Sequence, residues 1–330
     1  MTIGRVTTTQ LWSTSAANVQ ASKARLSQLS NQSSTGMLVT KPSDDPAASS
    51  AILKVLSQQS ANTQYATNIN DGLGWLSTAD STMTSAENLV RQAKDLTIQA
   101  ANSGTSSAAS REAIAAQLEG VRDDLLAAAN TKYNGRSIFA GTSDAAAAFD
   151  ASSTPPYAYS GTTTTQNPDG TTTTTSLGTV QRRIGSGTAD TVTVSADGAA
   201  AFGSGADSVF AQIQGVIDAL RSPGYDADTP DAVTGVTPKD AITAGIGALG
   251  AALTNLSTQH AVVGANYARL TSAKTQNATT ATALETQRSG LQDADTTKTL
   301  LDLKTQELAY QTALQVTAQV LQPTLMSFLS

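Results

Sequence analysis

The side chains that could do chemistry are few in this chain of 330 residues. His260 is the single histidine and no cysteine is present, so thiolate chemistry, disulfides and a zinc site built on two histidines are excluded. Asp44 and Asp45 are neighbours, as are Asp123 and Asp124, and neighbouring side chains on a helix point about 100° apart. These pairs therefore do not provide the two converging carboxylates that general acid–base catalysis needs.

Structural roles explain these residues better than catalytic ones. His260 falls on the apolar stripe of a long predicted helix, where we expect a hydrogen-bonded polar residue between helices. Asp45 followed by Pro46 fits a helix N-cap with proline at the first helical position. The Gly-Leu-Gly stretch at 72–74 lies inside a helical pattern, so it does not indicate a phosphate-binding loop. No catalytic residue, cofactor or metal ion is expected.

Composition limits the classes of partner. Charged residues make up 14% of the chain and aromatic residues 4%, which suits thin, alanine-lined helix contacts better than a bulky core. The net charge of −6 argues against a nucleic-acid partner. No uninterrupted apolar run approaches the ~18 residues of a membrane span, and the first residues lack the pattern of a cleavable signal peptide. We therefore expect no membrane partner and no cleaved signal.

Apolar residues recur at helical spacing on both sides of a central segment. Gly36 ends the first helix as a left-handed cap, and Pro42 cannot continue a helix, so a turn is expected between 36 and 46. The first predicted helix is 3–36. The second starts at Pro46 and continues into a regular stretch at 69–100. Further helices are predicted at 110–130, from about 207 to 220 and at 238–291, and a last helix is ended by Pro323.

The central segment predicts β-structure. Asn134-Gly135 favours the positive φ angles of a type I′ hairpin turn, and Ser137-Ile138-Phe139 is expected to be a short strand. Two threonine runs flank the turn signal at 167–170, and 191–194 predicts another strand with Val192 and Val194 on one face. For 160–176 the alternative is a disordered or O-glycosylated threonine linker.

These patterns together predict a mainly α fold with a β insertion: a long antiparallel helical rod that carries a small Thr-rich β-domain. We expect that domain to be autonomous and exposed on the surface. The predicted organisation is a terminal assembly helix at 1–42, the rod with its hairpin at 43–142, the β-domain at 143–206, the returning rod at 207–292 and a second terminal helix at 293–330.

The two ends of the chain each carry one narrow apolar stripe. A lone helix of this kind is marginal in water, because nucleation is costly and most helix stability comes from packing the apolar face. We therefore expect the ends to be largely disordered in the free chain and to fold when neighbouring subunits bury the stripes. The predicted assembly residues are Trp12, Val19, Leu26 and Leu29 in front, and Leu303, Tyr310, Leu314, Leu321 and Phe328 behind.

Several stretches resemble the flagellin superfamily. "NINDGLGWLSTADSTMTSAENLVRQAKDLTIQAANSG" (68–104) is similar to its N-terminal rod helix, and "ANTKYNGRSIFAG" (129–141) to the hairpin that follows its third helix. "STGMLVTKPSDDPAASS" (34–50) and the ending at 310–330 resemble the superfamily's hook–filament junction proteins more than flagellins, which usually lack prolines matching Pro42 and Pro46. The resemblance covers about 1–142 and 205–330.

The resemblance implies a secreted structural subunit of the bacterial flagellum without catalytic activity. It implies export through the flagellar type III apparatus without a cleaved signal, and an extracellular location at the hook–filament junction. The terminal helices would form an inner tube, the rod helices an outer layer and the β-domain a surface knob. The implied partners are further copies of the chain in a ring, the first hook-associated protein, flagellin, and an export chaperone at the C-terminal end.

Two alternatives stay open at the level of sequence. One is a minor flagellin that forms part of the filament. The other is a signalling coiled coil of the chemoreceptor type, suggested by the Ala/Ser/Thr/Gln-rich stripes and disfavoured by the β insertion and the lack of a predicted membrane span.

Overall fold

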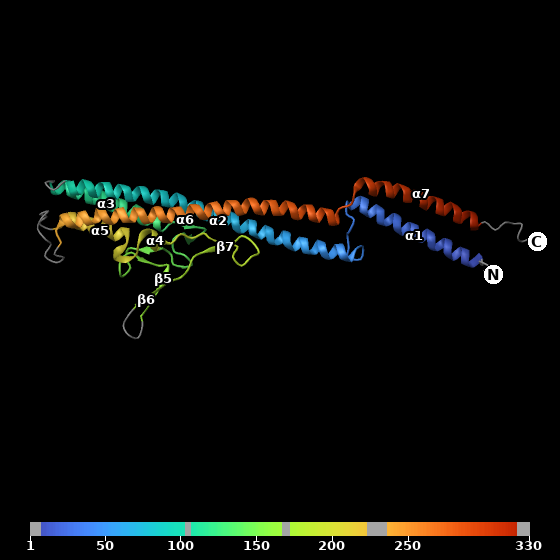
Figure 1. Ribbon diagram of the computed structural model, residues 1–330, viewed down its shortest axis with the longest axis horizontal. Coiled ribbons are helices and arrows are strands. Elements are labelled where there is room, and N and C mark those ends of the chain that lie inside the picture. Colours follow the sequence, from blue (N-terminus) through green and yellow to red (C-terminus); the bar gives the residue numbers. More distant parts are fainter. Residues whose placement is uncertain (1–7, 103–106, 167–171, 223–235, 322–330) are drawn as a thin grey trace, which may run out of the picture. The chain divides into compact units, whose positions relative to one another are not determined.

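The computed structural model describes residues 8–102, 107–166, 172–222 and 236–321. Two compact units make up the chain, one formed by residues 62–279 and the other by 1–61 together with 280–330. Figure 1 shows the order of the elements within each.

Long helices form most of unit 62–279. The helix α2 (Pro46–Asn102) is continuous, so the helix predicted from Pro46 and the regular stretch at 69–100 are one element; α3 (Ala108–Ala129) and α6 (Pro238–Gln292) also match their predicted positions. Large buried side chains recur every seven residues along both long helices. This repeat keeps one face of each helix against its neighbour. Its members are Ile69, Leu76, Met83 and Val90 on α2, and Leu249, Leu256, Val263 and Leu270 on α6.

A pair of asparagines marks the register of α2 against α6. Nδ2 of Asn277 donates to the backbone carbonyl (2.9 Å) and side-chain oxygen (2.7 Å) of Asn62, and Nδ2 of Asn62 donates to the carbonyl of Asn277 (3.1 Å). Further along α2, Asp80 and Glu87 meet His260, which precedes Asn277 on α6. The order of these contacts is reversed between the helices, so they run antiparallel. This confirms the predicted antiparallel rod.

The chain leaves the helices at a two-residue hairpin. Strand β1 (Lys132–Tyr133) pairs with β2 (Arg136–Ser137), and Asn134 (φ 48°) and Gly135 (φ 81°) adopt the positive angles that the sequence predicted. The strand is shorter than predicted: the N–H of Ile138 still donates to the carbonyl of Thr131 (3.1 Å), but the chain bends at Ile138 and Phe139, which are fully buried. The hairpin therefore turns the chain and places two large side chains in the core.

Aromatic rings fill the core of the central segment. The rings of Phe139 and Phe202 lie 5.1 Å apart, and those of Phe149 and Phe210 lie 5.2 Å apart. Phe210 belongs to helix α5 (Val209–Leu220), whose predicted apolar face is buried throughout. The surrounding elements are the pairs β3–β4 (Phe149–Asp150, Ala158–Tyr159) and β7–β8 (Gln181–Arg183, Thr191–Thr193), the helix α4 (Gly198–Phe202) and a 3₁₀ turn at Gly205–Asp207.

This aromatic core is continuous with that of the helices. The buried residues of the β-segment and those of α2, α3, α5 and α6 form a single apolar cluster. Arg182 on β7 also forms an ion pair with Asp71 on α2 (2.6 Å), and Nδ2 of Asn68 donates to the carbonyl of Arg183 (2.9 Å). The expectation of an autonomous β-domain is therefore wrong. Its side chains complete the core of the helices, which sequence periodicity could not reveal.

Among the described strands of this segment, those of the threonine hairpin contribute no residue to this core. Strands β5 (Thr162–Gln166) and β6 (Thr172–Ser176) pair antiparallel along their whole length, so the predicted β-structure is present rather than a linker without structure. The predicted turn at 167–170 lies outside the described residues. In Figure 1 the hairpin extends away from the helices of its unit.

The second unit contains the described parts of the chain ends. Helix α1 (Thr8–Thr35) ends at Gly36, which has the expected positive φ of 69°, and α7 (Thr296–Leu321) follows a short break after α6. Oδ1 of Asp45 accepts from the backbone N–H groups of Ala47 and Ala48, both at 2.9 Å, which confirms the predicted N-cap with Pro46 in the first turn. Pro42 lies in the turn between α1 and α2, as expected.

One window of 18 residues within α6 is apolar enough to span a membrane by length and composition, with a mean hydropathy of 1.2. The expectation that no apolar stretch approaches the length of a membrane span is therefore too strict. Of this window 22% is buried in the structure, and Ile242, Leu249 and Leu256 belong to the buried core cluster.

Candidate assembly surface

The two terminal helices pair with each other. At the base of the pair, the N–H of Leu38 donates to the carbonyl of Gln292 (2.7 Å), and the N–H of Ala294 donates to the carbonyl of Gly36 (2.8 Å). Further out, Nε2 of Gln306 donates to Oγ of Ser22 (2.8 Å). Figure 1 shows α1 and α7 side by side along their described lengths.

This pairing covers little apolar surface. Among the side chains described in the two helices, Leu29 of α1 and Thr299 of α7 are the only ones that are fully buried. Large apolar side chains remain in solvent: Leu301 is 67% exposed, Leu308 65% and Trp12 53%. A helix pair with so small a core gains little stability from packing, so the exposed side chains are available to other chains.

Helix α7 is apolar on two faces. At about 100° per residue, the half-buried Leu303 and Tyr310 lie on the side that meets α1, whereas Leu301 and Leu308 lie on the opposite side. Leu300, Leu314 and Val316 are exposed as well. A surface helix of a globular protein normally carries one apolar stripe, whereas the second apolar face of α7 stays exposed among the described residues.

A shallow groove of about 540 Å³ runs along the α1–α7 pair. Val316 lines it from α7 and Val19 from α1, and Leu308, which is 65% exposed, borders its outer edge. The remaining lining residues are small or uncharged: Ser15, Asn18, Thr305, Ala309, Thr312, Ala313 and Thr317. With this lining, the groove can pack an apolar side chain and offers no acid or base.

The predicted assembly residues fall into three groups. Val19, Leu26, Leu29, Leu303 and Tyr310 are buried or half-buried at the α1–α7 contact, whereas Trp12 and Leu314 are exposed. The side chain of Leu321, at the end of α7, and the whole of Phe328 lie outside the described part of the chain. Their role between subunits stays a prediction.

Sequence reasoning missed the second face of α7. It followed one stripe through Leu303 and Tyr310 and passed over Leu301 and Leu308. Their spacing of seven residues was the available signal, because two apolar series with the same period and a different phase indicate two faces.

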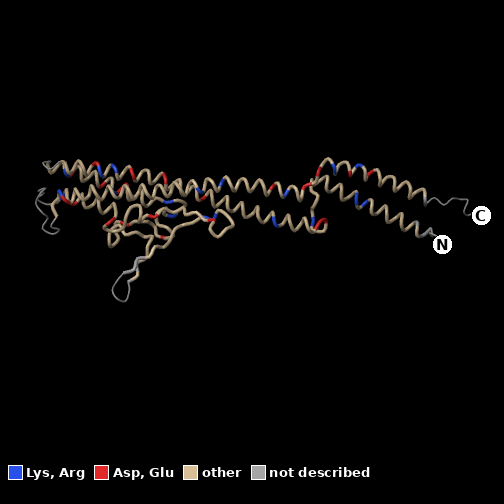
Figure 2. The backbone as a smooth tube through the Cα atoms, in the orientation of Figure 1, with Lys and Arg blue, Asp and Glu red and all other residues tan. Residues whose placement is uncertain are grey.

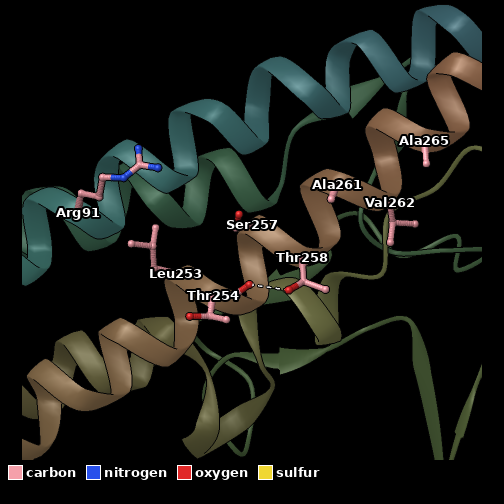
Figure 3. A pocket seen from close by; sticks show the side chains of 8 residues that line it. All are labelled: Arg91, Leu253, Thr254, Ser257, Thr258, Ala261, Val262 and Ala265. Carbon is pink, nitrogen blue, oxygen red and sulfur yellow. Dashed lines mark hydrogen bonds between the residues drawn. The ribbon is translucent and has the colours of Figure 1, made fainter.

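A second shallow groove, on α6, shows how little the rod offers for chemistry (Figure 3). Leu253, Val262 and several small side chains line it, and Oγ1 of Thr258 donates to the carbonyl of Thr254 (2.9 Å). The single charged lining residue is Arg91, which already binds Glu87 (2.7 Å). No pair of acid and base converges on this groove.

The sole histidine lies where an interhelical polar residue was expected. Nδ1 of His260 is 2.9 Å from Oε1 of Glu87, and Nε2 is 3.0 Å from Oδ1 of Asp80. Burial lowers the pKa of His260, but the bonds to Glu87 and Asp80 outweigh that effect and raise it overall. This prediction is confirmed.

Other charged and polar clusters join elements of the fold. Arg221, which caps α5, binds Glu112 (2.6 Å) and Glu119 (2.5 Å) of α3, and these bonds lower the pKa of both carboxyls. The buried hydroxyl of Tyr159 donates to the carbonyl of Phe139 (2.7 Å), and burial raises its pKa to about 12. Arg221 and the hydroxyl of Tyr159 thus bind partners within the chain.

Among the described residues, no group of His, Asp and Glu side chains has an arrangement that could hold a metal ion. Charges are also spread thinly along the described helices (Figure 2). The long helices and the exposed apolar side chains of α1 and α7 define a class: an α-helical structural protein with a surface suited to packing against other proteins.

Comparison with known proteins agrees with this class. The family model for the bacterial flagellin N-terminal helical region matches residues 6–144, and the model for the flagellin C-terminal helical region matches 246–329. The two regions together take up more than half of the chain. The chain belongs to the bacterial flagellin family.

Two curated relatives bear the name flagellar hook-associated protein 3. The protein from Salmonella typhimurium is 32% identical over 147 residues, which is 44% of this chain and 46% of the relative. The protein from Escherichia coli is 29% identical over 138 residues, which is 42% of this chain and 43% of the relative. The matched regions thus span just under half the length of these relatives.

Solved structures share the fold. A flagellar hook-associated protein from Vibrio parahaemolyticus aligns with 76% of this chain and all of its own, with a TM-score of 0.61 and 18% identity. Flagellar hook-associated protein 3 from Legionella pneumophila aligns with 73% of this chain and 98% of its own, with a TM-score of 0.54 and 13% identity. These values support the fold alone.

Proposed function

We propose that this protein is a structural subunit of the bacterial flagellum at the junction between hook and filament. The observation that carries the proposal is that both curated relatives it matches are named flagellar hook-associated protein 3. In this role the chain is a non-enzymatic, exported subunit that forms a ring with its own copies. It contacts the first hook-associated protein on one side and flagellin on the other. Before export, a chaperone binds its C-terminal end.

The terminal helices supply the assembly surface in this proposal. Leu301 and Leu308 on α7 face solvent in the isolated chain, and burying a leucine side chain contributes about 1.5–3 kcal/mol. Neighbouring subunits that cover these side chains therefore stabilise the assembly. The same helices have little core of their own, which suits a chain that crosses an export channel unfolded.

Deleting the gene in the source bacterium tests the function. We expect cells with hooks but no attached filaments, and flagellin monomers in the medium. Filaments that remain attached in cells with normal taxis would identify the protein as a minor flagellin instead. Intact filaments with lost taxis would support the signalling alternative. Returning the wild-type gene on a plasmid should restore the filaments and serves as the control.

A further inference from the structure

His260 holds an unusual position in the charge pattern of α6. Between Asp240 and Arg269 this helix contains no aspartate, glutamate, lysine or arginine, and Tyr267 is its only other ionisable side chain. Opposite this stretch, the facing helix α2 carries Asp80, Glu87, Arg91, Lys94 and Asp95, and of these Asp80 and Glu87 bind His260. Protonated His260 is therefore the one positive charge that this stretch of α6 can offer to α2.

Both nitrogens of the imidazole ring face a carboxylate. His260 lies between Glu87 and Asp80, which are one seven-residue repeat apart on α2, at 2.9 and 3.0 Å. Arg91 binds the other oxygen of Glu87 at 2.7 Å. Within the described chain, Glu87 and Asp80 are thus the charged partners of His260, and Arg91 is the charged partner of Glu87.

This geometry satisfies only one protonation state. The imidazolium ion donates from both nitrogens, so each carboxylate receives a charge-assisted hydrogen bond. Neutral imidazole keeps one N–H, and its other nitrogen then points a lone pair at a carboxylate oxygen about 3 Å away. Deprotonation thus removes one of the two bonds and the attraction between the helices at this position.

We propose that His260, Asp80 and Glu87 form a pH-sensitive clasp that joins α2 to α6 when the histidine is protonated and loosens when it is neutral. The side chain of His260 is 26% exposed, so protons reach it without unfolding of the helices. The partners of the clasp are 173 and 180 residues apart in sequence, so it joins the outgoing and returning helices of the rod.

The direction of the effect follows from linkage. The pKa of His260 is raised in the folded chain, so its contribution to stability is fully present below the unfolded value of about 6.5 and is lost as pH rises through the folded value. The α2–α6 contact should therefore be firmer in mildly acidic solution than at pH 8 or 9.

Nuclear magnetic resonance tests this on the full-length protein, because the single histidine gives one set of ring signals. We expect the midpoint of its titration above about 6.5 and a fall in that midpoint in Glu87→Gln, which keeps the side-chain shape. Glu119→Gln, which removes a carboxylate bound to Arg221, should leave the midpoint unchanged. A wild-type midpoint at or below that of an unstructured peptide would overturn the proposal.

Urea unfolding supplies the second measurement. The midpoint of the wild type should fall more between pH 6 and pH 9 than that of His260→Gln, which stays neutral at both. Equal pH dependence in the two proteins would also overturn the clasp. If His260→Gln does not fold, the Glu87→Gln titration decides alone.

Discussion

The helix pairs α2–α6 and α1–α7 are both antiparallel, yet they differ in what they bury. Leu256 on α6 and Met83 on α2 are completely buried, and large apolar residues repeat there every seven positions. In α1–α7, leucines such as Leu301 and Leu308 are about two-thirds exposed. The first pair has a core of its own, whereas the second has apolar surface in excess of what one chain can cover.

The physical basis of this difference is the number of partners. Unit 62–279 brings α3, α5 and the β-segment against its long helices, so their apolar side chains join one cluster. The described part of the other unit contains α1, α7 and the neighbouring ends of α2 and α6. The described partners of α1 and α7 are too few to cover their apolar side chains, and the proposed contacts between subunits would cover the rest.

Hydrogen exchange of the free subunit tests the comparison most directly. We expect amides of α1 and α7 to exchange at least about 100-fold faster than those of α2 and α6 at 69–90 and 249–270, because local opening is easiest where burial is least. Limited proteolysis should likewise trim both ends and leave a core of about residues 45–292. Equal protection of the two helix pairs would contradict the idea that the ends fold on assembly.

Charging the exposed face of α7 should abolish assembly without unfolding the subunit. Leu308→Asp is expected to leave the circular dichroism spectrum unchanged and to fail to restore filaments in a strain lacking the protein, because an unpaired carboxylate cannot be buried against a neighbour. Val262→Asp, at a 49% exposed site on α6, is the matched control and should restore them. Normal filaments with Leu308→Asp would contradict the proposal that this face of α7 contacts neighbouring subunits.

Cutting back the buried repeat should cost stability in the subunit itself. Leu256→Ala removes a fully buried side chain and should lower the free energy of unfolding by about 2–5 kcal/mol, measured with urea. Leu301→Ala, the same substitution at an exposed site, should change it by less than about 0.5 kcal/mol. Similar losses in both variants would mean that α7 is packed more tightly than the structure shows.

Breaking the asparagine pair should have a smaller effect. In Asn62→Ala the side-chain amide of Asn277 loses its side-chain partner within the contact, which should cost about 1–3 kcal/mol. Asn62→Ala combined with Asn277→Ala should cost less than the sum of the single variants, because each single variant already removes the bond between the two side chains. Strict additivity would show that the two asparagines act independently.

Removing the threonine hairpin should have the smallest effect. Gly161 and Leu177 already approach at its base, where the N–H of Leu177 donates to the carbonyl of Gly161 (2.9 Å). Replacing 162–176 by an Asn-Gly turn should therefore change the free energy of unfolding by less than about 0.5 kcal/mol. Replacing all of 143–203 should instead prevent stable folding, since it deletes Phe149 and Phe202 from the core. Folding of that larger deletion would restore the case for an autonomous domain.

Local signals accounted for most elements and their limits. The Asp45–Pro46 start of α2, the Asn134-Gly135 turn and the apolar face of α5 depend on neighbouring residues, and all three match the structure. The role of the β-segment could not be predicted in this way, because Phe149 and Phe210 meet only after the chain has folded back on itself. Likewise, the missed second face of α7 shows that following one stripe does not tell how many partners a helix has.

The sequence by itself determined the helices, their caps, the place where the chain turns and the family to which it belongs, since all of these reside in short-range patterns. Only the tertiary structure decided that the β-segment shares its core with the rod, that His260 sits between Asp80 and Glu87, and that Leu301 and Leu308 stay uncovered. Periodicity says which side of a helix is apolar. What covers that side depends on segments that are more than a hundred residues away, or on another chain.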